Sequence, residues 1–263
     1  MGRRLGQHFL KNEAILEKIA RIIEPCENMV VIEIGSGTGQ LTKHIIERFK
    51  NARIKKWQLV CIEKDKALIP ALKENIKGEY VKIINQDALD VFPLIASSRR
   101  ARHASYVVIG NIPYYITGSL LRVIGDAKVK PTQTIALIQE EVASRLTVRP
   151  PKMNMLAASV QYWGVPRKKF IVAAGNFNPP PKVSSAVIEI IPRVEKARCA
   201  PELFYKCMRA VFKQPRKMAV SNLAQGGYER EKIENVLRMY DLSKQARPQD
   251  LSVELIEKIA TQL

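Results

Sequence analysis

Short apolar segments alternate with segments of helical spacing, and this alternation constrains the fold more than any other feature of the chain. Segments rich in Val and Ile are predicted as strands, in chain order, at 29–34, 59–62, 81–84, 105–109, 132–138, 169–173 and 184–191. Helical spacing follows several of them, at 42–49, at 66–76 and from the end of the 132–138 strand through about Val148. Parallel strands are joined by long crossovers that are usually helices, so the pattern predicts an α/β fold with a parallel sheet covered on both faces. The last two strands, joined by one short proline-rich connection, are candidates for antiparallel pairing.

The chain changes character after Pro192. The segments with helical spacing that follow lie at 202–212, 216–224, 229–239 and 253–263. Ser252 is a candidate N-cap for the last of them, because a Ser side chain can accept a hydrogen bond from the first turn of a helix. The sequence therefore predicts two domains, a sheet domain over 1–194 and a small all-helical domain over 195–263.

The charge balance limits the partners that the chain can have. It has 43 Lys and Arg against 25 Asp and Glu, a net charge of +18 and a pI near 9.9. A field of this sign attracts polyanions, so nucleic acid is the favoured partner and an anionic membrane comes second. No apolar run approaches the ~18 residues of a membrane span, and no lipidation signal supports the membrane. A basic surface without a partner is the simpler alternative, and charge alone identifies no activity.

Cysteine and histidine usage points away from metal and disulfide chemistry. The 4 cysteines include no closely spaced pair, and with the 3 histidines they show no metal-binding spacing. A chain of 263 residues buries enough surface to fold without disulfides. We therefore expect no metal site and reduced thiols, as in the cytosol.

A glycine-rich turn follows the first predicted strand. Gly35, Gly37 and Gly39 stand at alternate positions between that strand and a helix. Glycines at such a turn let the backbone approach a ligand and present its N–H groups. The dinucleotide fingerprint GxGxxG is not met, because Gln40 stands where the third glycine would be. By itself the turn is equally compatible with a tight strand-to-helix connection.

Two acidic residues at the ends of the next strands favour a ligand. Glu63 ends the second strand, where a carboxylate can bind both hydroxyls of a ribose. Asp87 follows the third strand, where a carboxylate can accept a hydrogen bond from an adenine amino group. Each acid alone is more often a solvated residue or a helix cap. Together with the glycine turn they predict a nucleoside cofactor, and without the dinucleotide fingerprint S-adenosylmethionine fits better than NAD.

The sequence Asn111-Ile112-Pro113-Tyr114 follows the fourth strand at the same predicted sheet edge. The exocyclic amine of adenine or cytosine is a poor nucleophile, because its lone pair is delocalised into the ring. An Asn side-chain carbonyl and a backbone carbonyl can accept its hydrogens and direct its lone pair toward a methyl sulfonium. Proline stiffens the turn, and Tyr114 offers a face on which a flipped base can stack. An ordinary Asn–Pro turn is the alternative.

At these positions the chain resembles a known family, the adenine N6,N6-dimethyltransferases that act on the rRNA of the small ribosomal subunit (the KsgA family). The resemblance covers nearly the full length. Besides Glu63, Asp87 and the Asn111–Tyr114 motif, it rests on the segments GQHFL at 6–10, IEIGSGTG at 32–39, FNPPPKVSSAV at 177–187 and FKQPRK at 212–217. The chain departs from common family residues at His8 (Asn), Ser36 (Pro), Ser184 (Asp) and Pro215 (Arg).

The resemblance implies a class I S-adenosylmethionine-dependent methyltransferase fold, Rossmann-like, with a mostly parallel seven-stranded sheet and a small helical C-terminal domain that recognises the ribosome. Four methyl groups would be transferred, two to each of two adjacent adenosines in the 3′-terminal hairpin of 16S rRNA. The residues that would contact the cofactor are His8, Leu10, Gly35, Gly37, Glu63, Asp87 and Asn111. Asn111 would orient the target amine, while Tyr114 and Phe177 would sandwich the target base.

The implied partner is 16S rRNA in the small subunit or its precursor, bound by a monomer. Because no transit segment precedes the motif that begins at Gly6, a prokaryotic cytoplasm is expected. One alternative is an erythromycin-resistance type methyltransferase, which shares the Asn111–Tyr114 motif and acts on 23S rRNA. The fuller 177–187 and 212–217 segments favour the small-subunit enzyme. The other alternative is a non-catalytic assembly factor, against which the intact Glu63, Asp87 and Asn111 argue.

Overall fold

Residues 8–76, 78–98, 105–195 and 197–263 are described by the computed structural model. Contacts divide the chain into one unit of Met1–Ala143 with Pro166–Pro192 and a second unit of Ser144–Val165 with Arg193–Leu263. This division differs from the boundary expected near residue 195, because it groups Ser144–Val165 with the C-terminal helices. Helix α8 (Met155–Gln161) packs against α9 (Pro201–Val211), which explains that grouping.

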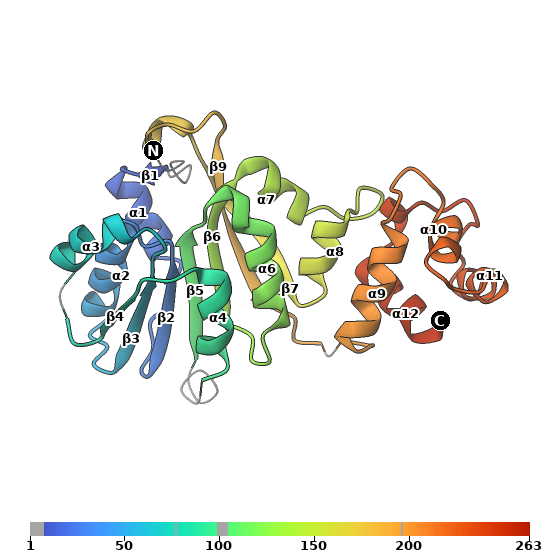
Figure 1. Cartoon of the computed structure of the whole chain (residues 1–263), viewed down its shortest axis with the longest axis horizontal. Helices are drawn as coiled ribbons and strands as arrows, with labels where there is room; N and C mark the ends of the chain where they lie inside the picture. The colour runs from blue at the N-terminus through green and yellow to red at the C-terminus, as the bar shows by residue number, and fades with distance from the viewer. Residues whose placement is uncertain (1–7, 77, 99–104, 196) are drawn as a thin grey trace. The chain divides into compact units, whose positions relative to one another are not determined.

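The first unit contains a seven-stranded sheet with the strand order β4-β3-β2-β5-β6-β9-β7 (Figure 1). Its strands are β2 (Met29–Ile34), β3 (Trp57–Ile62), β4 (Val81–Ile84), β5 (Tyr106–Asn111), β6 (Gln133–Gln139), β7 (Gly164–Val172) and β9 (Ser185–Pro192). Strands β4, β3, β2, β5 and β6 pair in parallel, and β9 pairs antiparallel with β6. The predicted mostly parallel sheet is therefore confirmed, and its last two strands are neighbours as expected.

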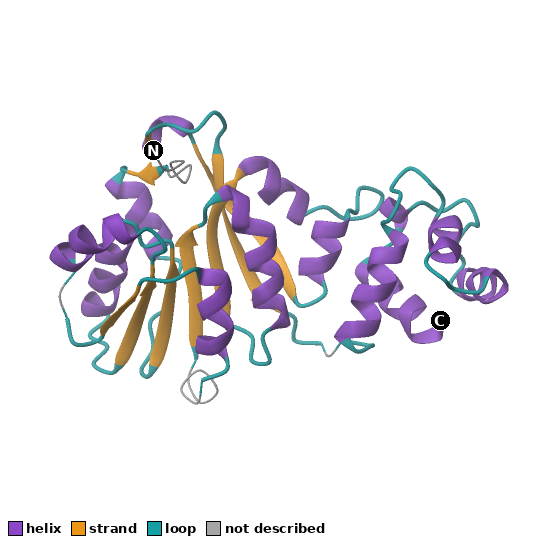
Figure 2. Cartoon of the chain, in the orientation of Figure 1, coloured by secondary structure: helices purple, strands orange, loops and turns teal. Residues whose placement is uncertain are grey.

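Helices cover both faces of this sheet (Figure 2). Helix α1 packs against α2, and α4 packs against α6. The helices that connect the strands are α1 (Glu13–Ala20), α2 (Gln40–Asn51), α3 (Ile69–Asn75), α4 (Ala88–Ala96), α6 (Thr117–Asp126) and α7 (Glu140–Leu146). The sequence prediction included α2, α3 and α7 but not α1, α4 or α6.

The core lies between the sheet and its helices. All six residues of β2 are buried, as are β3 residues 59–62. Strands buried on both faces read as continuous apolar runs, which is why these two were recognisable in the sequence. Beside them the rings of Phe49, Trp57 and Tyr80 stack, with centroids 4.0 Å and 4.7 Å apart. This stack lies at the start of β3, because Trp57 is the first residue of that strand.

A small second sheet joins two segments that are far apart in the sequence. Strand β1 (Phe9–Leu10) pairs antiparallel with β8 (Phe177–Asn178), and Leu10 stands opposite Phe177. The pairing continues where the Lys11 N–H donates to the Asn176 carbonyl at 2.9 Å. It brings together the two segments, at 6–10 and 177–187, on which the family resemblance partly rests. Gly6 and Gln7 of the first segment lie outside the described residues.

The second unit is helical, as predicted for most of it. Besides α8 and α9 its helices are α10 (Ala219–Gln225), α11 (Arg230–Met239) and α12 (Val253–Gln262). The Leu255 N–H donates to Ser252 Oγ at 3.2 Å, which confirms the predicted cap of α12. Across the described residues of both units, no helix combines the length and the apolar character needed to cross a membrane.

Candidate cofactor and substrate site

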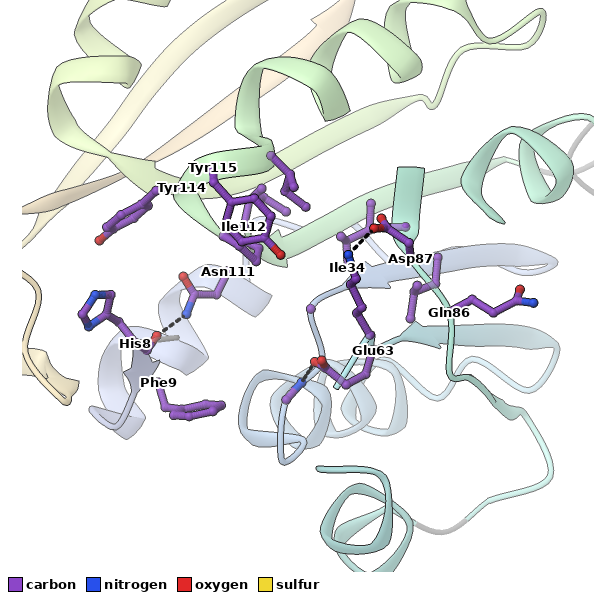
Figure 3. A pocket seen from close by; sticks show the side chains of 17 residues that line it. His8, Phe9, Ile34, Glu63, Gln86, Asp87, Asn111, Ile112, Tyr114 and Tyr115 are labelled. Atoms are coloured by element: carbon purple, nitrogen blue, oxygen red, sulfur yellow. Dashed lines mark hydrogen bonds and ion pairs between the residues drawn. The ribbon is translucent and has the colours of Figure 1, made fainter. Parts of the chain in front are cut away.

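A cavity lies at the carboxyl edge of the sheet, where β2, β3, β4 and β5 end (Figure 3). It opens to solvent and has about 770 Å³ of space free of protein atoms, the opening included. Open α/β sheets bind their ligands at this edge. The lining residues are His8, Phe9, Ile34, Gly35, Gly37, Ile62, Glu63, Lys64, Gln86, Asp87, Ala88, Asn111, Ile112, Pro113, Tyr114, Tyr115 and Ile116.

The glycine turn forms the floor of the cavity. Gly35 and Gly37 have positive φ angles of +72° and +56°, a conformation that favours glycine. A Cβ at Gly35 would lie 3.2 Å from the Asn111 carbonyl oxygen, and one at Gly37 would lie 3.1 Å from the Phe9 ring. Backbone and an aromatic ring therefore approach the turn more closely than a side chain would permit.

Glu63 is held by two backbone groups at the end of β3. Its Oε2 accepts from the Gly37 N–H at 2.8 Å, and its Oε1 accepts from the Asp65 N–H at 2.8 Å. A carboxylate oxygen has two acceptor positions, so each oxygen retains one for a ligand. With its side chain fixed and only 4% of the residue exposed, Glu63 presents a rigid pair of acceptors suited to a ribose diol.

Asp87 begins the helix that follows β4. Its Oδ1 accepts from the Leu89 N–H at 2.9 Å, which caps α4. Its Oδ2 accepts from Lys64 Nζ at 2.7 Å. The hydrogen bond from Lys64, followed by that from Leu89, lowers the pKa of Asp87. The residue is thus an ionised acceptor in the cavity wall, and both of its predicted alternatives, helix cap and ligand contact, are compatible with this position.

Asn111 is the last residue of β5. Its Nδ2 donates to the backbone carbonyl of His8 at 2.8 Å. This bond fixes the orientation of the amide through its nitrogen. The carbonyl Oδ1 at the other position is then available as an acceptor. Figure 3 shows Asn111, Tyr114 and His8 gathered on one side of the cavity, with Glu63 and Asp87 on the other.

Tyr114 carries an aromatic face beside Asn111. Its hydroxyl bonds to Ser185 Oγ at 2.9 Å, and its ring centroid lies 5.9 Å from that of His8 with the planes 30° apart. His8 is itself held by its Nδ1, which donates to the Pro179 carbonyl at 2.8 Å. The structure thus places the His8 ring, and not Phe177, next to the ring of Tyr114.

Two predicted contact residues do not line the cavity. Leu10 and Phe177 are only 4% and 2% exposed and pack in the hydrophobic core as opposite residues of β1 and β8. They hold the segment that carries His8 and Phe9. Direct contact of Leu10 with the cofactor and of Phe177 with a target base stays a prediction.

Three functional candidates were missed by the sequence reasoning. Lys64 and Tyr115 line the cavity directly after Glu63 and Tyr114, and Tyr115 is 59% exposed, unusual for an aromatic residue. Both residues directly follow a motif residue in the sequence, and this position was the signal that could have identified them. Glu33 lies outside the cavity lining and is 1% exposed in the middle of β2. A single acid within an apolar strand was its signal.

Glu33 supports the glycine turn from inside the protein. Its Oε2 accepts from Thr42 Oγ1 at 2.6 Å, and the Cys61 thiol lies 3.6 Å from the same oxygen. Burial raises the pKa of Glu33 to about 7, although the hydrogen bond from Thr42 acts in the opposite direction. Glu33 belongs to β2, Thr42 to α2 and Cys61 to β3, so this carboxyl connects the two elements that flank the turn and contacts the neighbouring strand.

The residues present fit S-adenosylmethionine. The turn provides close backbone approach, Glu63 has two acceptor positions for a ribose, and Asp87 is an ionised acceptor for an amino group. The described residues contain no group of three or more His, Cys, Asp or Glu side chains that could hold a metal ion.

Comparisons with known proteins agree with this chemistry. A family model for ribosomal RNA adenine dimethylase matches residues 2–262. The ribosomal RNA small subunit methyltransferase A of Mesomycoplasma hyopneumoniae strain 232 is 34% identical over 260 residues, covering 98% of this chain and 94% of that protein. The protein of the same name from Dehalococcoides mccartyi strain BAV1 is 33% identical over 259 residues, covering 97% and 86%.

Solved structures show the same fold. A dimethyladenosine transferase from Plasmodium falciparum superposes with a TM-score of 0.77 at 22% identity and covers 96% of each chain. The 23S rRNA methyltransferase ErmE superposes with a TM-score of 0.70 at 22% identity, covering 97% of this chain and 99% of that one. These likenesses confirm the class I methyltransferase fold. With the family model matched along nearly its whole length and relatives above 30% identity, this chain belongs to the ribosomal RNA adenine dimethylase family.

Proposed function

We propose that this chain uses S-adenosylmethionine to dimethylate the N6 amines of two adjacent adenosines in the 3′-terminal hairpin of 16S rRNA, within the small ribosomal subunit or its precursor. The observation that carries the proposal is one cavity in which Glu63, Asp87, Asn111 and Tyr114 come from the ends of successive parallel strands. All of its lining residues belong to the first unit of a single chain, which supports action as a monomer.

Glu63 and Asp87 would bind the two ends of the cofactor's nucleoside. Glu63 would accept hydrogen bonds from the ribose hydroxyls, and Asp87 would accept one from the adenine amino group. Gly35 and Gly37 would let the rest of the cofactor approach the backbone. The cofactor supplies a methyl group bound to a positively charged sulfur, which makes that methyl electrophilic.

Asn111 would prepare the target amine for attack. Its Oδ1 would accept an N–H of the adenine and direct the nitrogen lone pair toward the methyl carbon. The nitrogen–carbon bond forms as the sulfur–carbon bond breaks, and the extra N–H proton then leaves to solvent. The bond from Asn111 Nδ2 to the His8 carbonyl fixes the amide for this role.

Tyr114 would hold the target base by stacking. Aromatic rings bind the faces of unpaired bases with little dependence on sequence. The hydrogen bond to Ser185 fixes the orientation of the Tyr114 ring. His8 and, if the β1–β8 region rearranges, Phe177 would form the opposite wall.

We assign cofactor binding and catalysis to the first unit and rRNA recognition to the helical second unit. The net charge of +18 supports binding to a polyanion. In the second unit the loop between α9 and α10 carries exposed cations at Lys213, Arg216 and Lys217. The names of the relatives favour the small subunit over the 23S rRNA on which ErmE acts.

Primer extension on small-subunit particles tests the proposal. Because N6-dimethyladenine cannot form a normal base pair, treatment with protein and S-adenosylmethionine should produce stops at two adjacent adenosines near the 3′ end of 16S rRNA. Asn111→Ala provides the matched control and should give at most weak stops within the same incubation time. Stops confined to 23S rRNA would favour the erythromycin-resistance type enzyme. RNA binding without methyl transfer would favour the assembly factor.

A further inference from the structure

Lys64 forms an ion pair that the catalytic proposal leaves unexplained. It follows Glu63 directly, and its Nζ lies 2.7 Å from Asp87 Oδ2. The side chains of Lys64 and Asp87 are 50% and 22% exposed, and both residues line the cavity. The pair therefore joins the ends of β3 and β4 at the wall where the adenine end of a nucleoside would lie.

The two bonds of Asp87 fix its carboxylate at both oxygens. Oδ1 is held by the Leu89 N–H and Oδ2 by Lys64. Without Lys64, the helix cap alone would hold the group, and the carboxylate plane could rotate. Since each oxygen can accept a second hydrogen bond, the ion pair orients Asp87 without saturating it.

We propose that Lys64 is a positioning residue that acts through Asp87, holding its carboxylate in the orientation that accepts a hydrogen bond from the 6-amino group of the cofactor's purine. This inference rests on the proposed cofactor. An ionised carboxylate only accepts hydrogen bonds, so it can bind a purine that carries an amino group. It has no hydrogen to donate to a purine that lacks the amino group. Lys64 thereby contributes to the selection of an adenine nucleoside.

A competing arrangement predicts the opposite effect. The ammonium of Lys64 could occupy the acceptor position that the amino group needs. Its removal would then strengthen cofactor binding. Exposed ion pairs also often contribute little to stability, so a purely superficial role would leave binding unchanged. The three roles predict a different sign, or a different dependence on the ligand, for the change in affinity when Lys64 is replaced. A thermodynamic cycle therefore separates them.

The cycle combines one substitution with one ligand change. Calorimetry would measure the affinity of wild type and Lys64→Met for S-adenosylhomocysteine and for its analogue with hydrogen in place of the 6-amino group. Methionine keeps much of the side-chain length and removes the charge. We expect Lys64→Met to weaken S-adenosylhomocysteine binding about fivefold and to leave the analogue within about twofold. Lys64→Arg should restore most of the loss.

Two further variants control for the loss of a positive charge and for the role of Asp87. Lys66 is exposed and does not line the cavity, so Lys66→Met makes the same charge change and should affect neither ligand. In an Asp87→Asn background, where Asn can still cap α4, Lys64→Met should have no further effect. This second result shows that Lys64 acts through Asp87.

The outcomes that overturn the inference are distinct from failure of the proposed function. Equal loss for both ligands, no loss for either, or tighter binding of S-adenosylhomocysteine by Lys64→Met would each show that Lys64 does not position Asp87 for the amino group. If folded wild-type protein binds neither ligand, the proposed cofactor itself is wrong, and the inference fails with it.

Discussion

The side-chain amide of Asn111 donates a hydrogen bond to the backbone carbonyl of His8, a residue 103 positions earlier in the chain, at 2.8 Å. This bond joins the end of β5 to the segment that β1 pairs with β8. The same segment supplies His8 and Phe9 to the cavity. The orientation of the proposed amine acceptor therefore depends on a part of the chain that lies far from it in sequence.

Asn111→Ala should reduce the rate of methyl transfer by about 10²–10³-fold, the usual effect of removing one preorganised transition-state contact. The loss should appear in single-turnover kinetics on small-subunit particles. Asn111→Asp is the informative companion, because it keeps an acceptor but cannot donate to the His8 carbonyl. Methylation by Asn111→Ala at the wild-type rate would contradict the assigned role.

Substitutions at Tyr114 should distinguish the contribution of its ring from that of its hydroxyl. Tyr114→Ala should weaken capture of the flipped base by about 1–3 kcal/mol, the contribution of one aromatic stacking partner. Tyr114→Phe keeps the ring and loses only the bond to Ser185, so its activity should stay close to wild type. Equal damage in the two variants, measured under single-turnover conditions at several substrate concentrations, would show that the ring face is not what matters.

Glu63→Ala should weaken the binding of S-adenosylmethionine by about tenfold or more, because a hydrogen bond to a charged group contributes about 1.5–3 kcal/mol. Calorimetry on the folded variant measures this loss. The affinity for RNA should stay nearly unchanged and serves as the internal control. Unchanged cofactor affinity would remove Glu63 from the site.

The buried acid Glu33 should make stability fall as pH rises. Burial raises its pKa from 4.5 to about 7, so between these values the folded chain keeps a proton that the unfolded chain has lost. The contribution of Glu33 to the free energy of unfolding should therefore be full below pH 4.5 and decrease as pH rises through 7, by an amount on the order of 3 kcal/mol in all. Once the pH is more than about one unit above 7, this contribution should not change further.

Urea denaturation of wild type and Glu33→Gln at pH 5, 6, 7 and 8 isolates this effect. Glutamine retains an acceptor for Thr42 but does not titrate. The stability of wild type relative to the variant should decline across this range. A constant difference would mean that Glu33 is not protonated preferentially in the folded chain.

The sheet could be predicted because its central strands are largely continuous apolar runs. The observed limits of β2 and β4 coincide with the predicted ones. Two of the missed helices have weak local signals. Helix α4 contains Pro93, and α6 contains Gly118 and Gly125, residues that disfavour helix interiors. Strands β1 and β8 have two residues each, too few for a period, and only tertiary pairing creates them.

The site was predictable where residues follow strand ends. Glu63, Asp87 and Asn111 stand at the carboxyl ends of β3, β4 and β5, which lie at one edge of the parallel sheet, so the topology brings them together. Membership of the family confirms the predicted class of enzyme and cofactor. The pairing of β1 with β8, which places Leu10 opposite Phe177, has no local signal in the sequence. The ion pair of Lys64 with Asp87 likewise joins separate loops and has no local signature.

The pairing of β1 with β8 has a consequence for the order of events during synthesis. Residues 8–10 leave the ribosome long before 177–179, and His8 bonds to Pro179 across 171 positions. The wall that holds Asn111 through the His8 carbonyl can therefore form only after about two thirds of the chain has been translated. A nascent chain that already contains the glycine turn, Glu63, Asp87 and Asn111 would still lack the finished cavity, so competence for methyl transfer arises late in translation.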